Sequence, residues 1–520
     1  MLLSVLTIVN VISYTLVDVG LLARVRVLQI FRFRTMTQPR DDKDELARYQ
    51  GSAPKAGKGT AAASAVSGGH VSLEGVHSTV EVPHHEAGFW QQWRAFVGPA
   101  ILVSVGYMDP GNWGTDLQGG AQFKYALLWV VGLASMIAIF MQVISARLGV
   151  VTGKDLAQCC RDWYPAWTRW PNWLMSEMAI GACDLAEVLG SAVALNLLFH
   201  IPLLWAVIIT GVDVLLLLAL QSFGMRTIEA VVLLLIVTIA ACYFIEIFVL
   251  PETQPSFLEM ARALVSPRFG HAGMLYIAIG MIGATVMPHN LYLHSALVQS
   301  RQLQKDDQSV RRAIQFNTID STVALTVAFF VNAAILVLAA TVFFGKQSVT
   351  VAGGQVVTFT ANSDWIRVAY LTLAPLLGTA AASTLFAVAL LASGQSSTIT
   401  GTLAGQVVME GFMHWRIKPW VRRLITRTLA ILPAVFIIGL RGNSSVTDLL
   451  TLSQVVLALQ LPFAMFPLLQ FTSSRKRMGR WRNGWFLLVA GWASAILITA
   501  MDVWGLPDSL KAAWQVITGG

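Results

Sequence analysis

Two short stretches of the sequence combine residues that can bind a metal ion. Asp109 and Asn112 occur in the stretch DPGN, and Met287 and His289 occur in MPHN. A carboxylate, an amide oxygen, a thioether and an imidazole are all metal-ligand types. Both stretches lie in apolar segments, where a carboxylate costs about 2.5–3.5 kcal/mol on insertion scales and usually has a function. The two stretches therefore predict a cation site buried among apolar helices.

Each stretch also contains a proline that must interrupt its helix. Pro110 and Pro288 lack the backbone N–H and clash with the preceding turn, and Gly111 has no side chain to resist unwinding. Pro288 frees carbonyl groups one turn earlier, which implicates the carbonyl of Ala284. In a membrane such groups are tolerated only in a protein interior or a water-lined cavity. A proline alone would indicate a simple kink, but a kink does not explain Asp-Pro-Gly-Asn.

The composition is that of a membrane protein. Of the 520 residues, 55% are hydrophobic and 12% are charged, against roughly 25% charged residues in soluble domains. Apolar runs of about 20 residues, the length that crosses a bilayer, recur along the chain. The net charge of +8 would suit nucleic acid, but the basic residues concentrate in alternate connections, as expected for membrane topology. We expect an all-α polytopic membrane protein with no nucleic-acid partner.

Eleven membrane spans are predicted, and their order places the two breaks. The spans fall at 96–118, 126–148, 173–198, 204–220, 228–250, 273–299, 319–344, 371–392, 424–440, 449–471 and 484–504. The connections after the even-numbered spans are rich in Lys and Arg, which predicts that the N-terminus of the core is cytoplasmic. The breaks lie in the first and sixth spans, the offset expected for two five-helix units of inverted topology with substrate between them. The eleventh span is an addition.

The regions outside this core differ from it. Residues 1–35 contain an apolar segment that is either an extra span or an over-extended start of the reading frame. Residues 36–92 are rich in Ala, Gly, Ser and charge and are predicted to be a disordered cytoplasmic linker. The transporter-like core occupies 93–504, and 505–520 are expected to be a short tail.

A second polar group lies in the third span. Asp184 and Glu187 are three residues apart and share a helix face. Two helix–helix hydrogen bonds would explain them, but intramembrane acid chains in transporters usually relay protons, which we favour. Asp213 and Glu246 also lie within spans, and we assign them structural roles.

The ligand types indicate which metal ions could be the substrate, and three other classes of membrane protein are alternatives. A mixed oxygen and sulfur set suits Mn²⁺ or Fe²⁺, with Co²⁺, Zn²⁺ and Cd²⁺ as further candidates, and serves Mg²⁺ poorly. A membrane zinc enzyme would need several His or carboxylate ligands, and the sequence has no HExxH. A channel would use rings of repeated loops. A sodium-coupled organic solute symporter on the same fold is the closest alternative.

The motifs resemble the Nramp family of proton-coupled divalent metal transporters, in particular its bacterial MntH-like members. Both family signatures, DPGN and MPHN, are complete. Three further stretches are similar to the family: CDLAEVLGSAVALNLLF in the third span, LSQVVLALQLPFA in the tenth, and GQSSTITGTLAGQVVMEGF at 394–412, which resembles a cytoplasmic transport signature between the eighth and ninth spans. The resemblance covers residues 93–504.

The resemblance implies a fold, a site and an activity. The fold would be a LeuT-like 5+5 inverted repeat with broken helices 1 and 6 plus an eleventh span. The implied metal ligands are Asp109, Asn112 and Met287 by side chain, Ala284 and in some states Gly106 by carbonyl, and Gln454, with Gln460 as the competing choice. The implied proton pathway contains Asp109, His289, Asp184 and Glu187, with Arg301 and Arg427 facing the acid pair.

The activity implied by the resemblance is proton-coupled uptake of divalent transition-metal ions, chiefly Mn²⁺ and Fe²⁺. Such a protein is not an enzyme and needs no cofactor, because the metal ions and protons are its transported substrates. We expect a multi-pass protein of the inner (plasma) membrane. The order of preference among the ions and the oligomeric state stay open, and we expect a single chain to be functional.

Overall fold

The computed structural model describes most of the predicted core. Its described residues are 80–82, 88–211, 225–245, 247, 255–270, 273–303, 306–350, 356–358, 363–377, 380–415, 417, 419–441 and 446–518. The apolar segment 1–35 and most of the linker 36–92 lie outside them, as do Asp213 and Glu246, so those predictions stay untested.

The first and sixth spans are each divided into two helices. In the first span, α3 (Pro99–Ser104) and the 3-10 helix η4 (Val105–Met108) precede α4 (Pro110–Phe123). In the sixth, α12 (Met274–Val286) precedes α13 (Pro288–Leu297). Both predicted breaks are therefore present.

The other described elements form the rest of the bundle and its connections. The longer helices are α5 (Leu128–Thr152), α7 (Arg169–Phe199), α10 (Met225–Phe244), α14 (Asp307–Val342), α16 (Ala380–Met413), α17 (Pro419–Arg441), α18 (Val446–Ser473) and α20 (Trp485–Thr518). The shorter ones are α2 (Phe89–Phe96), α6 (Leu156–Trp163), η5 (Ala166–Thr168), α8 (Leu203–Thr210), α11 (Phe257–Leu264), η7 (Val298–Ser300), α15 (Trp365–Leu377), α19 (Arg475–Met478) and η9 (Gly479–Trp481). Strands β1 (Val80–Glu81) and β2 (Arg301–Gln302) pair in parallel, and β3 (Ser348–Thr350) and β4 (Val356–Thr358) pair antiparallel.

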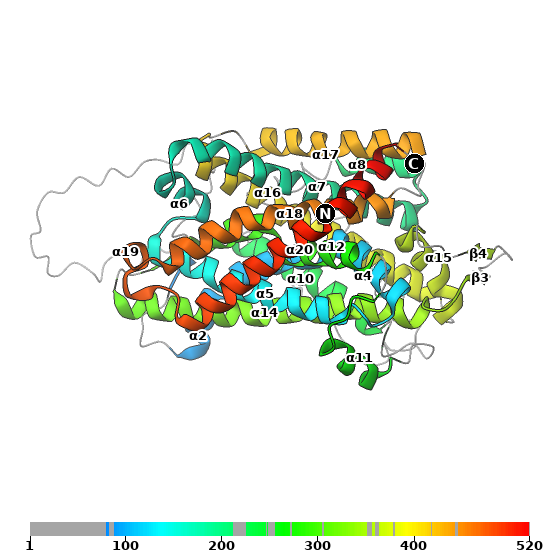
Figure 1. The fold of residues 1–520 in the computed structure, drawn as a ribbon, viewed down its shortest axis with the longest axis horizontal. Helices are drawn as coiled ribbons and strands as arrows, with labels where there is room; N and C mark the ends of the chain where they lie inside the picture. Colours follow the sequence, from blue (N-terminus) through cyan, green and yellow to red (C-terminus); the bar gives the residue numbers. More distant parts are fainter. Residues whose placement is uncertain are drawn as a thin grey trace, which may run out of the picture.

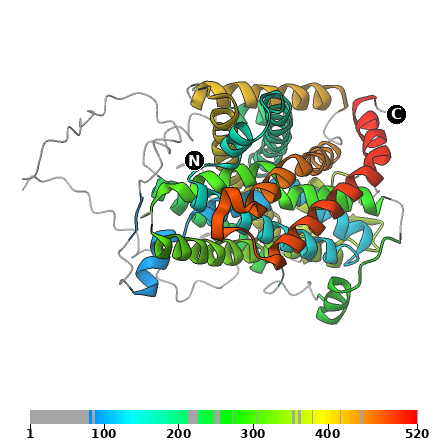
Figure 2. The ribbon, with the colours of Figure 1, turned by 60° about the vertical axis from the view of Figure 1, so that its left-hand side comes forward.

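The broken helices lie inside the bundle, and α17 and α20 lie at its edge. Eight helices among the described residues are long and apolar enough to cross a membrane. In the apolar stretch of Met274–Ser300, 89% of the residues are buried, whereas in that of Val421–Leu440 only 28% are buried. Helix α17 follows one edge of the bundle in both views (Figures 1 and 2). The segments α6 and α19 share one end of the bundle, and α15, β3 and β4 share the other (Figure 1).

The eighth span differs from its prediction. The sequence predicts a span at 371–392 followed by a connection through 394–412, but α16 runs unbroken from Ala380 to Met413. The predicted end of the eighth span at 392 was wrong for a physical reason. Hydroxyl groups at 394–412 bond within the helix, for example Thr398 to Gly394 and Thr402 to Thr398, and a Cβ on Gly394 would lie 2.3 Å from Ser191 Oγ of α7. The small polar residues therefore allow close packing of two buried helices. Helix α20 likewise continues to Thr518, beyond the predicted end at 504.

Helix α6, which joins two membrane helices at the end that also holds α19, is fixed by a buried cap. The Asp155 carboxylate accepts a hydrogen bond from Gln158 N at 2.8 Å, and the Gln158 side chain accepts one from Asp155 N at 3.1 Å. Burial raises the pKa of Asp155 to about 7, although the cap hydrogen bonds and Arg161 act in the opposite direction. The folded protein therefore holds the carboxyl proton of Asp155 more tightly than the unfolded chain does.

This pKa predicts how stability depends on pH. An acid with a raised pKa in the folded state favours folding at low pH, and that contribution is lost as the pH rises from the unfolded value of 3.8 towards about 7. Asp155→Asn keeps a cap acceptor but does not titrate. Between pH 5 and 8 we expect wild type to lose about 2 kcal/mol of stability relative to this variant. Thermal unfolding of both proteins in one detergent would measure this, and parallel pH profiles would contradict it.

Candidate functional site

The first break is formed around Asp109. This residue is the N-cap of α4, with extended backbone angles, and its Oδ1 accepts a hydrogen bond from Asn112 N at 2.9 Å. Neighbouring helices supply donors to the carbonyls that precede the break. Asn332 Nδ2 of α14 donates to Tyr107 O at 2.7 Å, and Ser393 Oγ of α16 donates to Met108 O. The unwound segment is thus held by side chains, as a membrane interior requires.

The second break is formed around Met287. Its φ of 33° is unusual for a residue with a side chain, and Pro288 opens the next helix. Because Pro288 has no N–H, the carbonyl of Ala284, four residues earlier, loses its helical donor. The Met287 sulfur accepts a hydrogen bond from Asn290 Nδ2 at 3.5 Å. The break therefore exposes one carbonyl oxygen and one thioether to the protein interior.

The two breaks lie against each other. A Cβ on Gly106, in the first, would be 3.2 Å from Met287 Sδ and 2.3 Å from Asn290 Nδ2. A Cβ on Gly111 would be 2.0 Å from the Gln454 amide nitrogen of α18. Glycine is required at both positions because a side chain would displace a predicted ligand or its neighbour.

The side-chain amide of Asn112 lies between Asp109, Ala284 and Asn332, and its orientation follows from these neighbours. In one orientation its oxygen would lie 2.6 Å from Asp109 Oδ1 and 3.3 Å from the Ala284 carbonyl oxygen, which are both acceptors. In the other, the nitrogen occupies that position and donates to both oxygens, while the amide oxygen accepts from Asn332 Nδ2 at 3.1 Å. Three oxygens so close together repel one another unless a cation lies among them. The first arrangement can bind a cation and the second is a closed hydrogen-bond network.

Further oxygen atoms that accept no hydrogen bond, and could therefore bind a metal ion, surround the junction. Asp109 Oδ2 and Gln454 Oε1 are buried and accept no hydrogen bond from the described part of the chain. Gln460 Oε1, from the competing glutamine, is also buried without such a bond, but the Gln454 amide is the one that lies against Gly111. The described residues contain no cluster of three or more His, Cys, Asp and Glu side chains arranged for a metal. The donors that do converge are one carboxylate, amide and carbonyl oxygens, and a thioether.

The acid pair of α7 is buried and paired with arginines. Arg423 Nη1 pairs with Asp184 Oδ1, and Arg423 Nη2 lies 3.0 Å from Glu187 Oε2. Arg427 Nη1 is 3.3 Å from the same oxygen, and Thr398 donates to it at 3.1 Å. Arg427 thus lies where the sequence predicts. Arg423 is not among the predicted site residues, although its spacing of four from Arg427 puts both on one helix face.

Arg301 does not face the acid pair, so that prediction was wrong. Its guanidinium lies 3.0 Å from Glu229 Oε1 of α10 and donates to the carbonyls of Ala95 and Val97 at 3.1 and 2.8 Å. The residue follows α13 at the end of the bundle where the first span begins, whereas the acid pair lies in the middle of α7. Arg301 therefore ties the start of the first span to α10.

The two histidines of the sixth span have different surroundings. His289 is buried, and its Nδ1 has no hydrogen bond within the described residues. His294 Nδ1 lies 2.8 Å from Gln142 Oε1, and Gln142 Nε2 donates to the Tyr107 hydroxyl at 2.5 Å. His289 is thus available beside the break, and His294 belongs to a polar chain that reaches the first break. The sequence contains a signal for the polar partners of the first break, since Gln142 and Asn332 are isolated amides in apolar helices.

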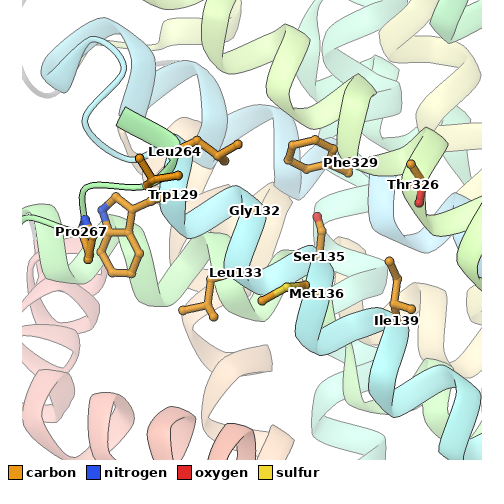
Figure 3. A pocket seen from close by; sticks show the side chains of 11 residues that line it. Trp129, Gly132, Leu133, Ser135, Met136, Ile139, Leu264, Pro267, Thr326 and Phe329 are labelled. Carbon is orange, nitrogen blue, oxygen red and sulfur yellow. The ribbon is translucent and has the colours of Figure 1, made fainter. Parts of the chain in front are cut away.

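An apolar cavity of about 530 Å³ lies away from this junction. Figure 3 shows it between α5, α14 and the end of α11, with Trp129, Met136 and Phe329 among its walls. None of the predicted site residues lines it. The donor groups therefore concentrate at the two breaks and not in this cavity.

Comparison with known proteins identifies the family of this chain. A family model described as natural resistance-associated macrophage protein-like (Nramp) matches residues 100–507. Similar relatives include proteins named divalent metal cation transporter MntH from Nostoc sp., 50% identical over 84% of this chain and 96% of the relative, and from Listeria monocytogenes, 47% identical over 83% and 94%.

Solved structures give the same family. A mutant of the Eremococcus coleocola manganese transporter superposes with a TM-score of 0.76 and 40% identity, over 86% of this chain and 92% of the other. A second structure of that transporter, in complex with an aromatic bis-isothiourea compound, gives 0.75 and 40%, over 85% and 91%. The predicted all-α membrane bundle with two broken helices is confirmed. With the family model matching most of the core and relatives near half identity, the chain belongs to the Nramp family.

Proposed function

We propose that this chain is a symporter that moves divalent transition-metal ions, chiefly Mn²⁺ and Fe²⁺, with protons into the cell across the plasma membrane by alternating access. Membership of a transporter family supports transport over an enzymatic role. The names of the relatives, divalent metal cation transporter and manganese transporter, support a metal ion as the cargo. Proton coupling, Fe²⁺ and the direction of transport belong to the proposal.

One observation carries the proposal. The Asn112 side-chain amide lies 2.6 Å from Asp109 Oδ1 and 3.3 Å from the Ala284 carbonyl oxygen at the junction of the breaks, and a Cβ on the neighbouring Gly106 would lie 3.2 Å from the Met287 sulfur. The carboxylate supplies negative charge, and the carbonyl end of α12 adds the partial negative charge of a helix C-terminus. Oxygen ligands with one thioether suit a first-row transition ion better than Mg²⁺ or Ca²⁺.

The acid pair is placed to couple protons to this site. A Cβ on Gly190 of α7 would lie 2.1 Å from Pro110 Cβ, so α7 packs directly against the first break. Glu187 is three residues before Gly190, on the same helix. A divalent ion that binds Asp109 favours release of its proton, and buried acids with arginine partners offer a route for it. We assign that route to Asp184 and Glu187, with Arg423, Arg427 and His289 beside them.

Uptake into proteoliposomes tests the function directly. The purified chain should take up radioactive Mn²⁺ faster when the outside is more acidic than the inside, and uptake should acidify the lumen. A sodium-coupled solute symporter would need a Na⁺ gradient, a channel would not be driven uphill by a pH gradient, and an enzyme would accumulate no Mn²⁺.

The Asp109 carboxylate should be essential for metal binding. Asp109→Ala removes the single carboxylate from the converging oxygens, and we expect Mn²⁺ affinity to fall on the order of 100-fold, as for loss of a charged partner. Binding measured by calorimetry in detergent would check this. Asp502→Asn is a matched control, because it removes a buried carboxyl of α20 outside the junction. Wild-type affinity in a folded Asp109→Ala protein would contradict the site.

The Met287 sulfur should determine selectivity more than affinity for Mn²⁺. Without the thioether, Met287→Ala loses a ligand that cannot replace the hydration of Ca²⁺ or Mg²⁺. We expect the excess of Ca²⁺ needed to compete with Mn²⁺ to fall about tenfold. Met281→Ala, which removes another buried methionine of the sixth span, is the control. The same competition curve for wild type and Met287→Ala would mean that the sulfur does not contact the ion.

The acid pair should affect proton movement more than metal binding. Asp184→Asn and Glu187→Gln keep the size of each side chain but cannot carry a proton. We expect near-normal Mn²⁺ affinity with metal-stimulated acidification reduced by about tenfold or more. Both quantities are measured on one preparation of each variant. Intact acidification together with lost binding would place the pair in the metal site or its scaffold instead.

A further inference from the structure

Asn332 of α14 is a buried amide with a fixed hydrogen-bond donor. Its side chain is 1% exposed, and its Nδ2 donates to Tyr107 O, a carbonyl just before the first break, at 2.7 Å. This bond sets the orientation of the Asn332 amide, because turning it would bring two oxygens together. The same nitrogen lies 3.1 Å from the Asn112 side-chain amide. Asn332 therefore presents an N–H, and not an oxygen, to Asn112.

This donor distinguishes the two arrangements of Asn112. With the Asn112 oxygen towards Asn332, that N–H finds an acceptor and the Asn112 nitrogen donates to Asp109 and Ala284. With the Asn112 oxygen towards Asp109 and Ala284, two amide nitrogens face each other at 3.1 Å. The Asn112 nitrogen then has a long hydrogen bond to Thr285 Oγ1 at 3.4 Å. The closed arrangement, with the Asn112 oxygen towards Asn332, satisfies more donors and contains no place for a cation.

We propose that Asn332 is a positioning residue that holds the Asn112 amide in the closed arrangement, so that an entering ion must turn this amide to bind. The inference rests on the proposed function and adds a determinant of affinity and selectivity to it. Strong binding of an ion to the three oxygens and the thioether offsets the loss of the hydrogen bond from Asn332 to Asn112. A weakly bound ion does not. On release, Asn332 recovers the amide oxygen and the site closes behind the ion.

The proposal predicts that replacing Asn332 raises the affinity for the metal ion, whereas replacing an ordinary metal ligand lowers it. If Asn332 bound the ion or only lined the site, replacing it would weaken binding or leave it unchanged. If it holds Asn112 closed, replacing it should strengthen binding. Asn332 Oδ1 is buried and accepts no hydrogen bond from the described residues, so removing this atom leaves no donor unpaired.

The test measures Mn²⁺ affinity by calorimetry on the full-length protein in detergent. Asn332→Leu, similar in shape but without a donor, should lower the Kd about fivefold, as expected for one lost hydrogen bond. In proteoliposomes the same variant should show a lower KM together with a lower maximal rate, because release slows. Ca²⁺ should compete better than in wild type. Asn317→Leu is the matched control, because Asn317 is a buried amide of α14 whose Nδ2 bonds to Ala313 O of its own helix.

A double-mutant cycle tests the mechanism itself. Asn112→Asp replaces the amide by a symmetric carboxylate, which has no orientation to select. The gain from Asn332→Leu should therefore vanish in the Asn112→Asp background. Asn332→Ser, which keeps a hydroxyl donor for the Tyr107 carbonyl, is the second variant if loss of the Tyr107 partner prevents Asn332→Leu from folding.

The outcomes separate this inference from the proposed function. Wild type that binds no Mn²⁺ would overturn both. Wild type that binds Mn²⁺ while a folded Asn332 variant binds equally or more weakly would overturn the inference alone. A gain that persists with Asn112→Asp would overturn it as well.

Discussion

Backbone carbonyls without helical donors are the constraint on which this structure depends. A membrane interior contains no bulk water to satisfy them, yet the chain interrupts two of its central helices. The two breaks solve this problem differently. In the first, Asn332 and Ser393 donate to the carbonyls of Tyr107 and Met108. In the second, the Ala284 carbonyl faces the Asn112 amide, which can be either a donor or an oxygen ligand.

This difference separates the structural carbonyls from those offered to a cation in the proposed function. The carbonyls of the first break are used by fixed side chains, which keeps the unwound segment in place. The Ala284 carbonyl and the Asp109 carboxylate share one partner, the Asn112 amide, and Asp109 Oδ2 accepts no hydrogen bond from the described residues. The charges of the acid pair are compensated separately by Arg423 and Arg427. In the proposed function, cation binding and proton movement would thus use neighbouring but distinct groups, and α7 packs against Pro110 between them.

The sequence was sufficient where a residue type has a local consequence. Pro110 and Pro288 must break helices wherever they are packed, so both breaks and their offset were predictable. The partner of a charged side chain depends on tertiary packing instead. Arg301 was assigned to the acid pair but binds Glu229, and Arg423 took its place. The stretch at 394–412 resembles a family signature placed between two spans, but it continues α16, its hydroxyls bond mostly within their own helix, and Gly394 and Gly401 pack against α7. Asn332 could not be given a role without its distance to Asn112.

X-ray absorption spectroscopy of the metal-loaded protein tests the central claim most directly. The account requires one ion per chain, held by oxygens of Asp109, Asn112 and Ala284 and by one sulfur. Spectra of Mn²⁺-loaded or Cd²⁺-loaded wild type should show a mainly oxygen shell with a single sulfur at longer distance, and the sulfur contribution should disappear in Met287→Ala. A shell of oxygen and nitrogen alone in wild type, or a sulfur contribution that survives the substitution, would contradict a site built from these two breaks.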